Sequence, residues 1–408
     1  MLIDFRKLFN VTIIPVSLLA CSIYFVPQLT KPLPNALQVI LPFLPFVIFI
    51  VGMGLSWIFH HSREFNLFLI LMVVYISLDN YIWHPSNKID FQLAYLLLVS
   101  LIPINYTYNL LLRERGILNH YGVRRFIFLA VQLYFVAWIL ENPLPQVKEY
   151  LSYTFFQHSL FKQTDVTQPI LLAIFITALI IIVRLLQNTS NLVASILISY
   201  IAVLAALYFA YTQQLALIFI LLAGLILIIG ITINAYSLAY LDELTNLPSR
   251  RALNQNITTL GKKYTLAMVD VDHFKKFNDK YGHDIGDQVL KKLASQLRLV
   301  RGGKAFRYGG EEFTLIFPNK DFHEARLICN ELCKTVANSP FMLRNKKRPK
   351  KITDGKKPSQ SGSKPLTITI SIGLAERSEE FVSSDQVMKQ ADKALYKAKK
   401  NGRNQVAV

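Results

Sequence analysis

Cysteine is scarce in this chain, with three residues in 408. Cys329 and Cys333 stand four residues apart on an expected helix, and no histidine or further cysteine lies near them with metal-ligand spacing. We therefore expect packing cysteines in a reducing compartment. Cys21 ends a segment, Leu18–Cys21, that resembles a lipoprotein cleavage site, but the apolar run continues through Val26. This continuation favours a retained span over cleavage and acylation.

Acidic residues are also few, with 26 Asp and Glu against 44 Lys and Arg and a net charge of +18. The chain is 52% hydrophobic, with a mean hydropathy of +0.35, which is too apolar for an ordinary soluble protein. Residues 1–239 carry 12 basic and 8 acidic side chains, a net of +4, whereas residues 240–408 carry 32 and 18, a net of +14. The composition therefore predicts a membrane half followed by a basic, soluble half.

About eight apolar segments of the first half are candidate membrane helices, since about 20 residues cross the hydrocarbon core. They lie near 12–29, 36–59, 65–84, 91–112, 125–140, 170–187, 193–211 and 214–236. With the N-terminus inside, the inner segments carry eight Lys and Arg and the outer segments four, which favours this orientation. We therefore predict a multi-pass protein of the bacterial cytoplasmic (inner) membrane, with its soluble half in the cytoplasm.

Few polar residues mark a ligand site within these spans. Asp79 and Asn105 are candidates because such side chains are costly in lipid, but Asp79 lies close enough to the outer interface to be solvated there. The outer loop at 141–169 is rich in aromatic residues. It suits either a cover over a binding site or an interfacial aromatic belt, and the sequence names no stimulus.

No glycine, proline or low-complexity linker separates the last span from the soluble half. Residues 234–241 therefore predict a continuous signalling helix between a regulatory membrane domain at 1–233 and a soluble domain at 242–408. Such a helix would transmit a shift or a rotation. A turn and a helix start follow, with Ser249 as the expected N-cap.

The soluble half alternates strand-like and helical segments. Strands are expected near 264–269, 304–308, 313–318 and 366–375, and helices near 273–281, 285–300, 321–337 and 384–400. This β-α-α-β-β-α-β-α order predicts an α+β fold, a sheet flanked by helices.

The most informative motif is Arg307–Phe313, in which Gly309 and Gly310 precede Glu311 and Glu312. Two glycines between apolar runs predict a β-hairpin with a bare tip. Bare backbone lets a phosphate approach closely, and neighbouring carboxylates can hold a divalent cation. The motif therefore indicates chemistry on a nucleoside triphosphate, if other segments supply matching residues.

Two acids end the first strand of the soluble half. Asp270 and Asp272 project at the edge of the sheet, although for Asp272 capping of the next helix is the favoured interpretation. His283, in the turn after that helix, is more typical of a structural histidine than of a catalyst.

Substrate-binding candidates follow these acids. Lys275 has the reach to contact a phosphate, while the amide of Asn278 and the carboxylate of Asp287 suit the edge of a guanine base. Lys399 and Arg403 stand one helical turn apart, a spacing that suits a polyphosphate. The alternative for these two is a solvated basic helix end.

Residues 344–364 form a basic insertion with nine Lys and Arg and one acid, mixed with Pro, Gly and Ser. The composition predicts a solvated, flexible loop. The functional alternative is contact with anionic lipid head groups. Nucleic-acid binding is not expected, because few aromatic residues are interleaved.

Together these motifs resemble the GGDEF family, the diguanylate cyclases. The resemblance covers about residues 240–408 and rests on five motifs in order, at 242–251, 270–287, 307–313, 369–375 and 391–404. It implies a sheet like that of the polymerase palm and the nucleotide cyclases. It also implies conversion of two GTP into cyclic di-GMP and two pyrophosphates, by a homodimer in which each domain binds one GTP.

The resemblance also implies site residues. Mg²⁺, or Mn²⁺ in its place, would be held by Asp270, Glu311 and the carbonyl of Val271, with Glu311 also helping to deprotonate the attacking hydroxyl. Asn278 and Asp287 would bind guanine. Phosphates would be held by Gly309, Gly310, Lys275, Lys399 and Arg403.

The departures from the family pattern are few. Glu311 stands at a position where either acid occurs. Asn246 replaces a glycine and tolerates a left-handed backbone, and Ser249 replaces an asparagine and is expected to cap equally well. The family's inhibitory Arg-x-x-Asp is replaced by Val300 and Gly303, so product inhibition through that site is not expected.

Two alternatives compete with a membrane-bound cyclase. One is a catalytically silent receptor for GTP or for a protein, which is disfavoured because the Gly-Gly-acid signature is intact. The other is a cyclase with altered base choice, which Asp287 disfavours.

Overall fold

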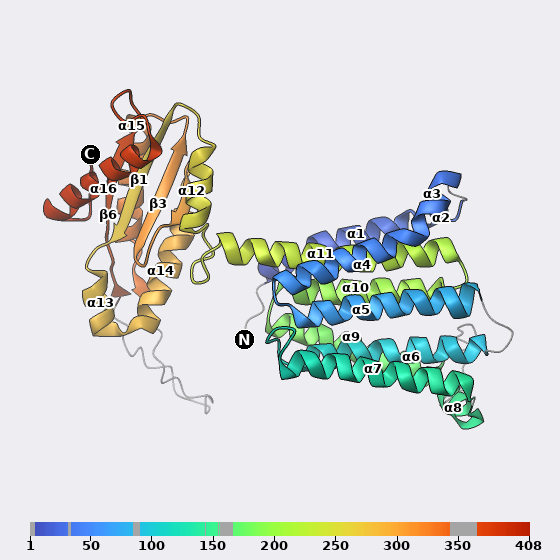
Figure 1. Ribbon diagram of the computed structural model, residues 1–408. Helices are drawn as coiled ribbons and strands as arrows, with labels where there is room; N and C mark the ends of the chain where they lie inside the picture. Colours follow the sequence, from blue (N-terminus) through green and yellow to red (C-terminus); the bar gives the residue numbers. More distant parts are fainter. Residues whose placement is uncertain are drawn as a thin grey trace, which may run out of the picture. The chain divides into compact units, whose positions relative to one another are not determined.

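The computed structural model describes residues 5–31, 34–84, 90–142, 144–153, 155, 166–342 and 365–408 (Figure 1). The chain divides into two compact units, Met1–Ala235 and Tyr236–Val408. The predicted basic loop at 344–364 lies outside the described residues.

The first unit is helical. Within its described residues, seven helices are long and apolar enough to cross a membrane, and the apolar stretch Val11–Tyr24 is shorter. The elements are α1 (Phe5–Tyr24), α2 (Val26–Leu29), α3 (Asn35–Ile40), the 3₁₀ turn η1 (Leu41–Phe43), α4 (Leu44–Ile58), α5 (Ser62–Ser77), the π-helical η2 (Leu78–Trp83), α6 (Phe91–Leu111), α7 (His120–Glu141), α8 (Pro145–Leu151), α9 (Gln168–Gln187), α10 (Asn191–Tyr208) and α11 (Gln213–Tyr240).

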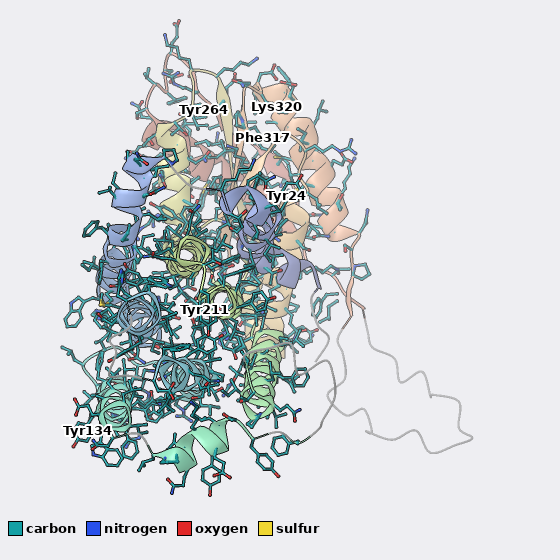
Figure 2. The ribbon with its side chains drawn as sticks, turned by 90° about the vertical axis from the view of Figure 1, so that its right-hand side faces the viewer. Tyr24, Tyr134, Tyr211, Tyr264, Phe317 and Lys320 are labelled. Atoms are coloured by element: carbon teal, nitrogen blue, oxygen red, sulfur yellow. The ribbon has the colours of Figure 1, made fainter. Side chains whose placement is uncertain are left out.

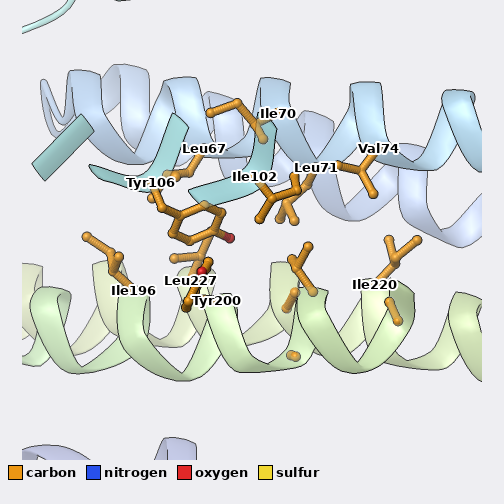
Figure 3. Packing of buried hydrophobic residues seen from close by; sticks show 14 of the residues in the cluster. Leu67, Ile70, Leu71, Val74, Ile102, Tyr106, Ile196, Tyr200, Ile220 and Leu227 are labelled. Atoms are coloured by element: carbon orange, nitrogen blue, oxygen red, sulfur yellow. The ribbon is translucent and has the colours of Figure 1, made fainter. Parts of the chain in front are cut away.

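The helices of this unit pack around an apolar interior. Leu67 of α5, Tyr106 of α6, Tyr200 of α10 and Leu227 of α11 meet there (Figure 3). The rings of Tyr106 and Tyr200 have their centroids 5.0 Å apart. Apolar and aromatic side chains also cover the outside, and Tyr134 at the edge of the bundle is 73% exposed (Figure 2). A helical unit that is apolar inside and out suits a lipid solvent.

The two polar candidates of this unit differ in their surroundings. The Asp79 side chain is 43% exposed, with His84 Nδ1 3.4 Å from its carboxylate, which agrees with a solvated position. Asn105 is buried, and its amide donates to the Leu101 carbonyl and to Gln132 Oε1. Its hydrogen bonds therefore join α6 to α7.

The second unit is an α+β domain. Its elements are α12 (Arg250–Thr258), β1 (Tyr264–Val271), α13 (Phe274–Tyr281), α14 (His283–Leu297), β2 (Lys304–Arg307), β3 (Glu312–Pro318), α15 (Phe322–Ala337), β4 (Phe341–Met342), β5 (Pro365–Leu366), β6 (Ile370–Glu376), α16 (Ser384–Lys400) and β7 (Val406–Ala407). A five-stranded sheet has the order β2-β3-β1-β6-β7, and β4 pairs with β5. The predicted order of strands and helices is confirmed, although the last long strand begins at Ile370 and not at 366.

Helices cover both faces of this sheet (Figure 1). Along β1, side chains alternate between two cores. Ala267 and Val269 face α14 and α15, whereas Leu266 and Met268 face α12 and α16. Such a doubly covered central strand is buried at every position, and this fixes the register of its pairing with β3 and β6.

Cys329 and Cys333 of α15 are free and buried in the first of these cores, as expected for packing cysteines. Burial raises the pKa of Cys333 to about 12, which keeps the thiol neutral and unreactive.

Helix α16 packs closely against β6 at Gly373, which has no side chain. A Cβ added at Gly373 would overlap the backbone of Ala391 and Leu395. This close approach places the last turn of α16, with Lys399, at the end of β1.

Candidate active site

The core of the site lies where β1 ends beside the β2–β3 hairpin. In the antiparallel register, Asp270 is opposite Glu312, which places the preceding Glu311 near the end of β1. Asp270 is 4% exposed, and burial raises its pKa. Burial, followed by the charge of Asp270, also raises the pKa of Glu311. Asp270 is thus poorly solvated, and its negative charge makes ionisation of the neighbouring Glu311 harder.

Lys399 reaches this pair from α16. Its Nζ lies 2.9 Å from Asp270 Oδ1 and lowers the pKa of Asp270, although burial outweighs it. Sequence reasoning placed Lys399 among the phosphate contacts, and in the structure it contacts the proposed metal ligand directly.

The acid pair fits a divalent cation. Two partly desolvated carboxylates with raised pKa values are stabilised by a positive charge between them. The described residues contain no group of three His, Cys, Asp or Glu side chains that could hold a metal. Further ligands would therefore be other oxygens, and the carbonyl of Val271 remains the predicted one.

The hairpin turn is braced by Arg307, which sequence reasoning did not single out. Arg307 Nη2 donates to the Gly310 carbonyl at 2.7 Å, and its Nε donates to the Gly309 carbonyl at 3.2 Å. Its Nη1 donates to Asp242 Oδ1 at 2.7 Å. A Cβ at Gly310 would meet no atom within 4 Å, so there is open space beside the backbone of this turn.

Asp242 and Arg307 are 65 positions apart, and they begin the motifs at 242–251 and 307–313. The spacing of the sequence does not predict this ion pair, because a contact between two distant segments leaves no periodic pattern.

The proposed base-binding residues lie on α13 and α14. Asn278 Oδ1 is buried and has no hydrogen-bond partner within the described part of the chain. A Cβ at Gly286 would overlap the Asn278 amide, so a residue without a side chain makes room for it. Asp287 follows Gly286 and is exposed, as is Lys275 on the first turn of α13. An orphan buried acceptor fits a ligand N–H donor.

Arg403 follows α16 in a left-handed turn. Its φ is 64°, and its amide donates to the Ala398 carbonyl at 3.0 Å. The charge of Arg403 helps to lower the pKa of Asp270, so the structure brings it toward the acid pair together with Lys399.

Asp272 has another role than helix capping. Its carboxylate accepts hydrogen bonds from Thr369 Oγ1 at 2.7 Å, Ser371 Oγ at 2.6 Å and the Asn404 amide at 3.0 Å. The N-cap of α13 is His273, whose side chain makes no capping bond. Asp272 therefore ties β6 and the C-terminal segment to the end of β1.

Two expectations for the first motif have different outcomes. Asn246 has a φ of 53°, which confirms the left-handed backbone. Ser249 stands at the N-cap of α12 without a side-chain capping bond, and its hydroxyl is buried and unpartnered within the described residues. The expected cap is therefore wrong. The Ser249 amide donates instead to the Tyr240 carbonyl at 2.7 Å.

Comparison with known proteins identifies this domain. Residues 239–405 match the family model "Diguanylate cyclase, GGDEF domain". The second unit is therefore a GGDEF domain, with the mixed sheet and flanking helices of that class.

More particularly, the relatives include diguanylate cyclases. The chain is 39% identical over 173 residues to diguanylate cyclase VdcA of Vibrio cholerae, covering 41% of this chain and 46% of that protein. It is 35% identical over 184 residues to response regulator PleD of Caulobacter vibrioides, covering 42% of this chain and 37% of that protein. The chain thus spans less than half the length of these curated relatives.

Solved structures give a similar match. The coiled coil and GGDEF domain of DgcB from Caulobacter crescentus, in complex with c-di-GMP, is 34% identical. The alignment covers 43% of this chain and 88% of that one, with a TM-score of 0.37.

Proposed function

We propose that this protein is a membrane-bound diguanylate cyclase that condenses two GTP into cyclic di-GMP and two pyrophosphates. The observation that carries the proposal is the pair Asp270 and Glu311, two acids with raised pKa values beside a bare Gly-Gly turn. The match of residues 239–405 to the cyclase family supports it.

In this proposal, each domain binds one GTP and two domains face each other in a homodimer. The 3′-oxygen of each GTP attacks the α-phosphate of the other, a P–O bond forms, and pyrophosphate leaves. A bound Mg²⁺ or Mn²⁺ would stabilise the attacking and leaving oxygens. Asp270, Glu311 and the Val271 carbonyl would hold it, and Glu311 would accept the proton of the hydroxyl.

The remaining residues bind and orient the nucleotide. The unpartnered Oδ1 of Asn278 and the exposed carboxylate of Asp287 accept N–H groups of guanine. Gly309 and Gly310 let the phosphates approach the backbone, and Lys275, Lys399 and Arg403 supply positive charge. Lys399 must then move from Asp270 toward a phosphate when the cation binds.

The apolar helices of the first unit support a place in the bacterial cytoplasmic membrane, with the GGDEF domain in the cytoplasm. Helix α11 runs unbroken from Gln213 to Tyr240, which supports control of the cyclase through this helix. The basic residues at 344–364 remain a predicted contact for anionic lipid.

We also propose that product does not inhibit through an Arg-x-x-Asp site. A Cβ at Gly303 would meet Phe317 Cε1 at 2.8 Å and Val300 Cγ1 at 3.1 Å, so an aspartate there would be strained. Cyclic di-GMP added to the enzyme should leave the rate unchanged. Inhibition that disappears on Arg301→Ala would contradict this.

The decisive experiment is turnover by the full chain in membranes or nanodiscs. With GTP and Mg²⁺, the wild type should produce cyclic di-GMP and pyrophosphate, and Glu311→Gln should abolish both. Glu379→Gln, which changes an exposed acid outside the site, should remain active and serves as the matched control. A wild type that stays inactive even when two copies are joined by forced dimerisation would overturn the proposal.

A further inference from the structure

A pocket of about 680 Å³ lies at one end of the helical unit. Two short connections line it, the one from α4 to α5 and the one from α6 to α7. Its lining includes Trp57, Phe59, His60, Arg115, Ile117 and Leu118. This is the end at which α4, α6 and α9 finish and from which α11 leaves (Figure 1).

Hydrogen bonds and close packing hold the connection from α6 to α7 that lines the pocket. Asn119 caps α7, accepting from the amides of Tyr121 at 2.9 Å and Gly122 at 3.2 Å, and its own amide donates to the Arg115 carbonyl. A Cβ at Gly122 would overlap the Ile117 carbonyl, so the connection packs directly on the first turn of the helix.

The acid in the lining is already paired. Glu114 accepts from the Ser62 amide at 2.8 Å, from Ser62 Oγ at 2.6 Å and from the Arg63 amide at 3.0 Å. It also lies 3.7 Å from Arg63 Nε and 3.9 Å from Arg125 Nη2. Burial alone would raise its pKa, but these hydrogen bonds and arginines hold the pKa of Glu114 below its usual value. The negative charge of Glu114 is therefore balanced by arginines and hydrogen-bond donors of the protein itself.

An excess of positive charge remains at this end. The two connections and the adjoining helix turns, 57–64 and 111–125, carry five arginines and two glutamates. Arg63 and Arg125 offset the buried Glu64 and the partly buried Glu114. Arg113, Arg115 and Arg124 are exposed, and no acid of these segments is left to balance them.

The rim of the pocket is apolar and exposed. Leu118 is 79% exposed, Trp57 is 48% exposed and Phe59 is 43% exposed. Such side chains beside unbalanced arginines, at the end of long apolar helices, have the make-up of a membrane interface.

We infer that this pocket binds an anionic phospholipid, its phosphate held by Arg115 and the imidazole of His60 and its acyl chains against Trp57, Phe59 and Leu118. The inference rests on the membrane placement proposed above. A soluble anion would use the cation but leave the apolar rim in water, whereas a lipid uses both. Since α11 leaves from the same end, the lipid would sit where the membrane half connects to the cyclase.

Trp57 gives a direct test, because the chain has three tryptophans, the others being Trp83 and Trp138. The full chain with Trp83→Phe and Trp138→Phe is placed in nanodiscs that contain a minor fraction of brominated lipid, which quenches tryptophan on contact. Brominated phosphatidylglycerol should quench Trp57 more strongly than the same fraction of brominated phosphatidylcholine. Arg115→Ala should lower this preference roughly fivefold, the change that corresponds to about 1 kcal/mol per basic residue at an anionic surface.

Two matched controls sharpen the result. Arg184→Ala removes an exposed arginine from the last turn of α9, outside the pocket lining, and should leave the preference unchanged. A chain that keeps Trp138 alone, near the other end of α7, should be quenched equally by both lipids.

Three outcomes would overturn the inference. They are equal quenching of Trp57 by the two lipids, equal effects of Arg115→Ala and Arg184→Ala, and loss of the preference on adding glycerol phosphate, which would assign the site to a soluble anion. No quenching of Trp138 by either lipid would instead refute the membrane placement itself. If the double Trp variant does not fold, native mass spectrometry of the otherwise unmodified chain should retain phosphatidylglycerol in preference to phosphatidylcholine, and Arg115→Ala should lose it.

Discussion

The guanidinium of Arg307 donates from Nη1 to the carboxylate of Asp242 across 2.7 Å. Asp242 stands two residues after the end of α11, and Arg307 also holds the carbonyls of Gly309 and Gly310. One side chain therefore connects the segment that follows α11 to the turn where the phosphates are proposed to bind. A displacement of Asp242 would therefore reach that turn through Arg307, the last residue of β2.

Replacing Asp242 by Asn should destabilise the GGDEF domain at neutral pH and not in acid. Burial would raise the pKa of Asp242, but hydrogen bonds from Thr245 and Arg307 lower it below its usual value. Its folded pKa is thus below the unfolded value of about 3.9, so its stabilisation is full above that value and is lost as pH falls through the folded pKa. We expect a loss of about 2 kcal/mol at pH 7.

Calorimetry of the full chain, with and without the substitution, would measure this difference across pH. A difference between variant and wild type that stays the same from pH 7 to pH 3 would contradict the role given to the carboxylate charge.

Replacing Lys399 by Met should strengthen cation binding and weaken nucleotide binding. Lys399 Nζ lies 2.9 Å from Asp270 Oδ1. Removing this ammonium group therefore leaves a proposed ligand oxygen free to bind the cation. We expect a several-fold lower Mn²⁺ dissociation constant without GTP, read by electron paramagnetic resonance, and a several-fold higher KM for GTP. Lys400→Met, at an exposed neighbouring position, should change neither. Weaker Mn²⁺ binding in the Lys399 variant would show that Lys399 supports the metal site and does not compete with it.

Two glycine substitutions should separate folding from catalysis. Gly373→Ala would place a methyl group against the backbone of α16 and should destabilise the domain by about 3 kcal/mol. Gly310→Ala meets no atom within 4 Å and should leave stability unchanged while lowering turnover, because the methyl group lies where phosphate is proposed to approach. Thermal unfolding and initial rates measure the two effects. A Gly310 variant with wild-type turnover would remove this turn from the phosphate site.

Alanine insertions into α11 should change cyclase activity periodically. Each inserted residue rotates the downstream GGDEF domain by about 100°, since the helix has about 3.6 residues per turn. The insertions of one to four residues belong after Ala235, because the Tyr240 carbonyl accepts from Ser249 and an insertion after Tyr240 would break that contact. Rates in nanodiscs with equal protein amounts measure the response. A flat response would argue against coupling through helix rotation.

Much of the domain could be predicted from sequence because its signals are local. The apolar run of β1, the paired glycines of the hairpin and the apolar period of α14 each lie within a short window. The left-handed Asn246 followed from its residue type. The features beyond prediction depend on tertiary approach, such as Asp242 against Arg307 and the contact of Lys399 with Asp270.

The errors have the same origin. Ser249 has the residue type of an N-cap, but the structure uses its backbone amide to close the turn after α11 and leaves its hydroxyl without a partner in the described part of the chain. Asp272 was expected to cap α13, but its carboxylate accepts hydrogen bonds from Thr369, just before β6, and from Ser371 on β6, both nearly 100 positions away. At both positions, hydrogen bonds to residues outside the following helix replace the helix capping that the residue type favours locally.

Asp272 also affects what can be concluded from the sequences of related domains that lack catalytic activity. Its carboxylate is occupied by three donors that fix the architecture, whereas Asp270 and Glu311 are the acids proposed for catalysis. In a related chain without catalytic activity, those two acids could be replaced, whereas replacing Asp272 would leave its three donors without their acceptor. An aspartate at this position in a related chain therefore indicates an intact fold and does not show whether that chain is catalytically active.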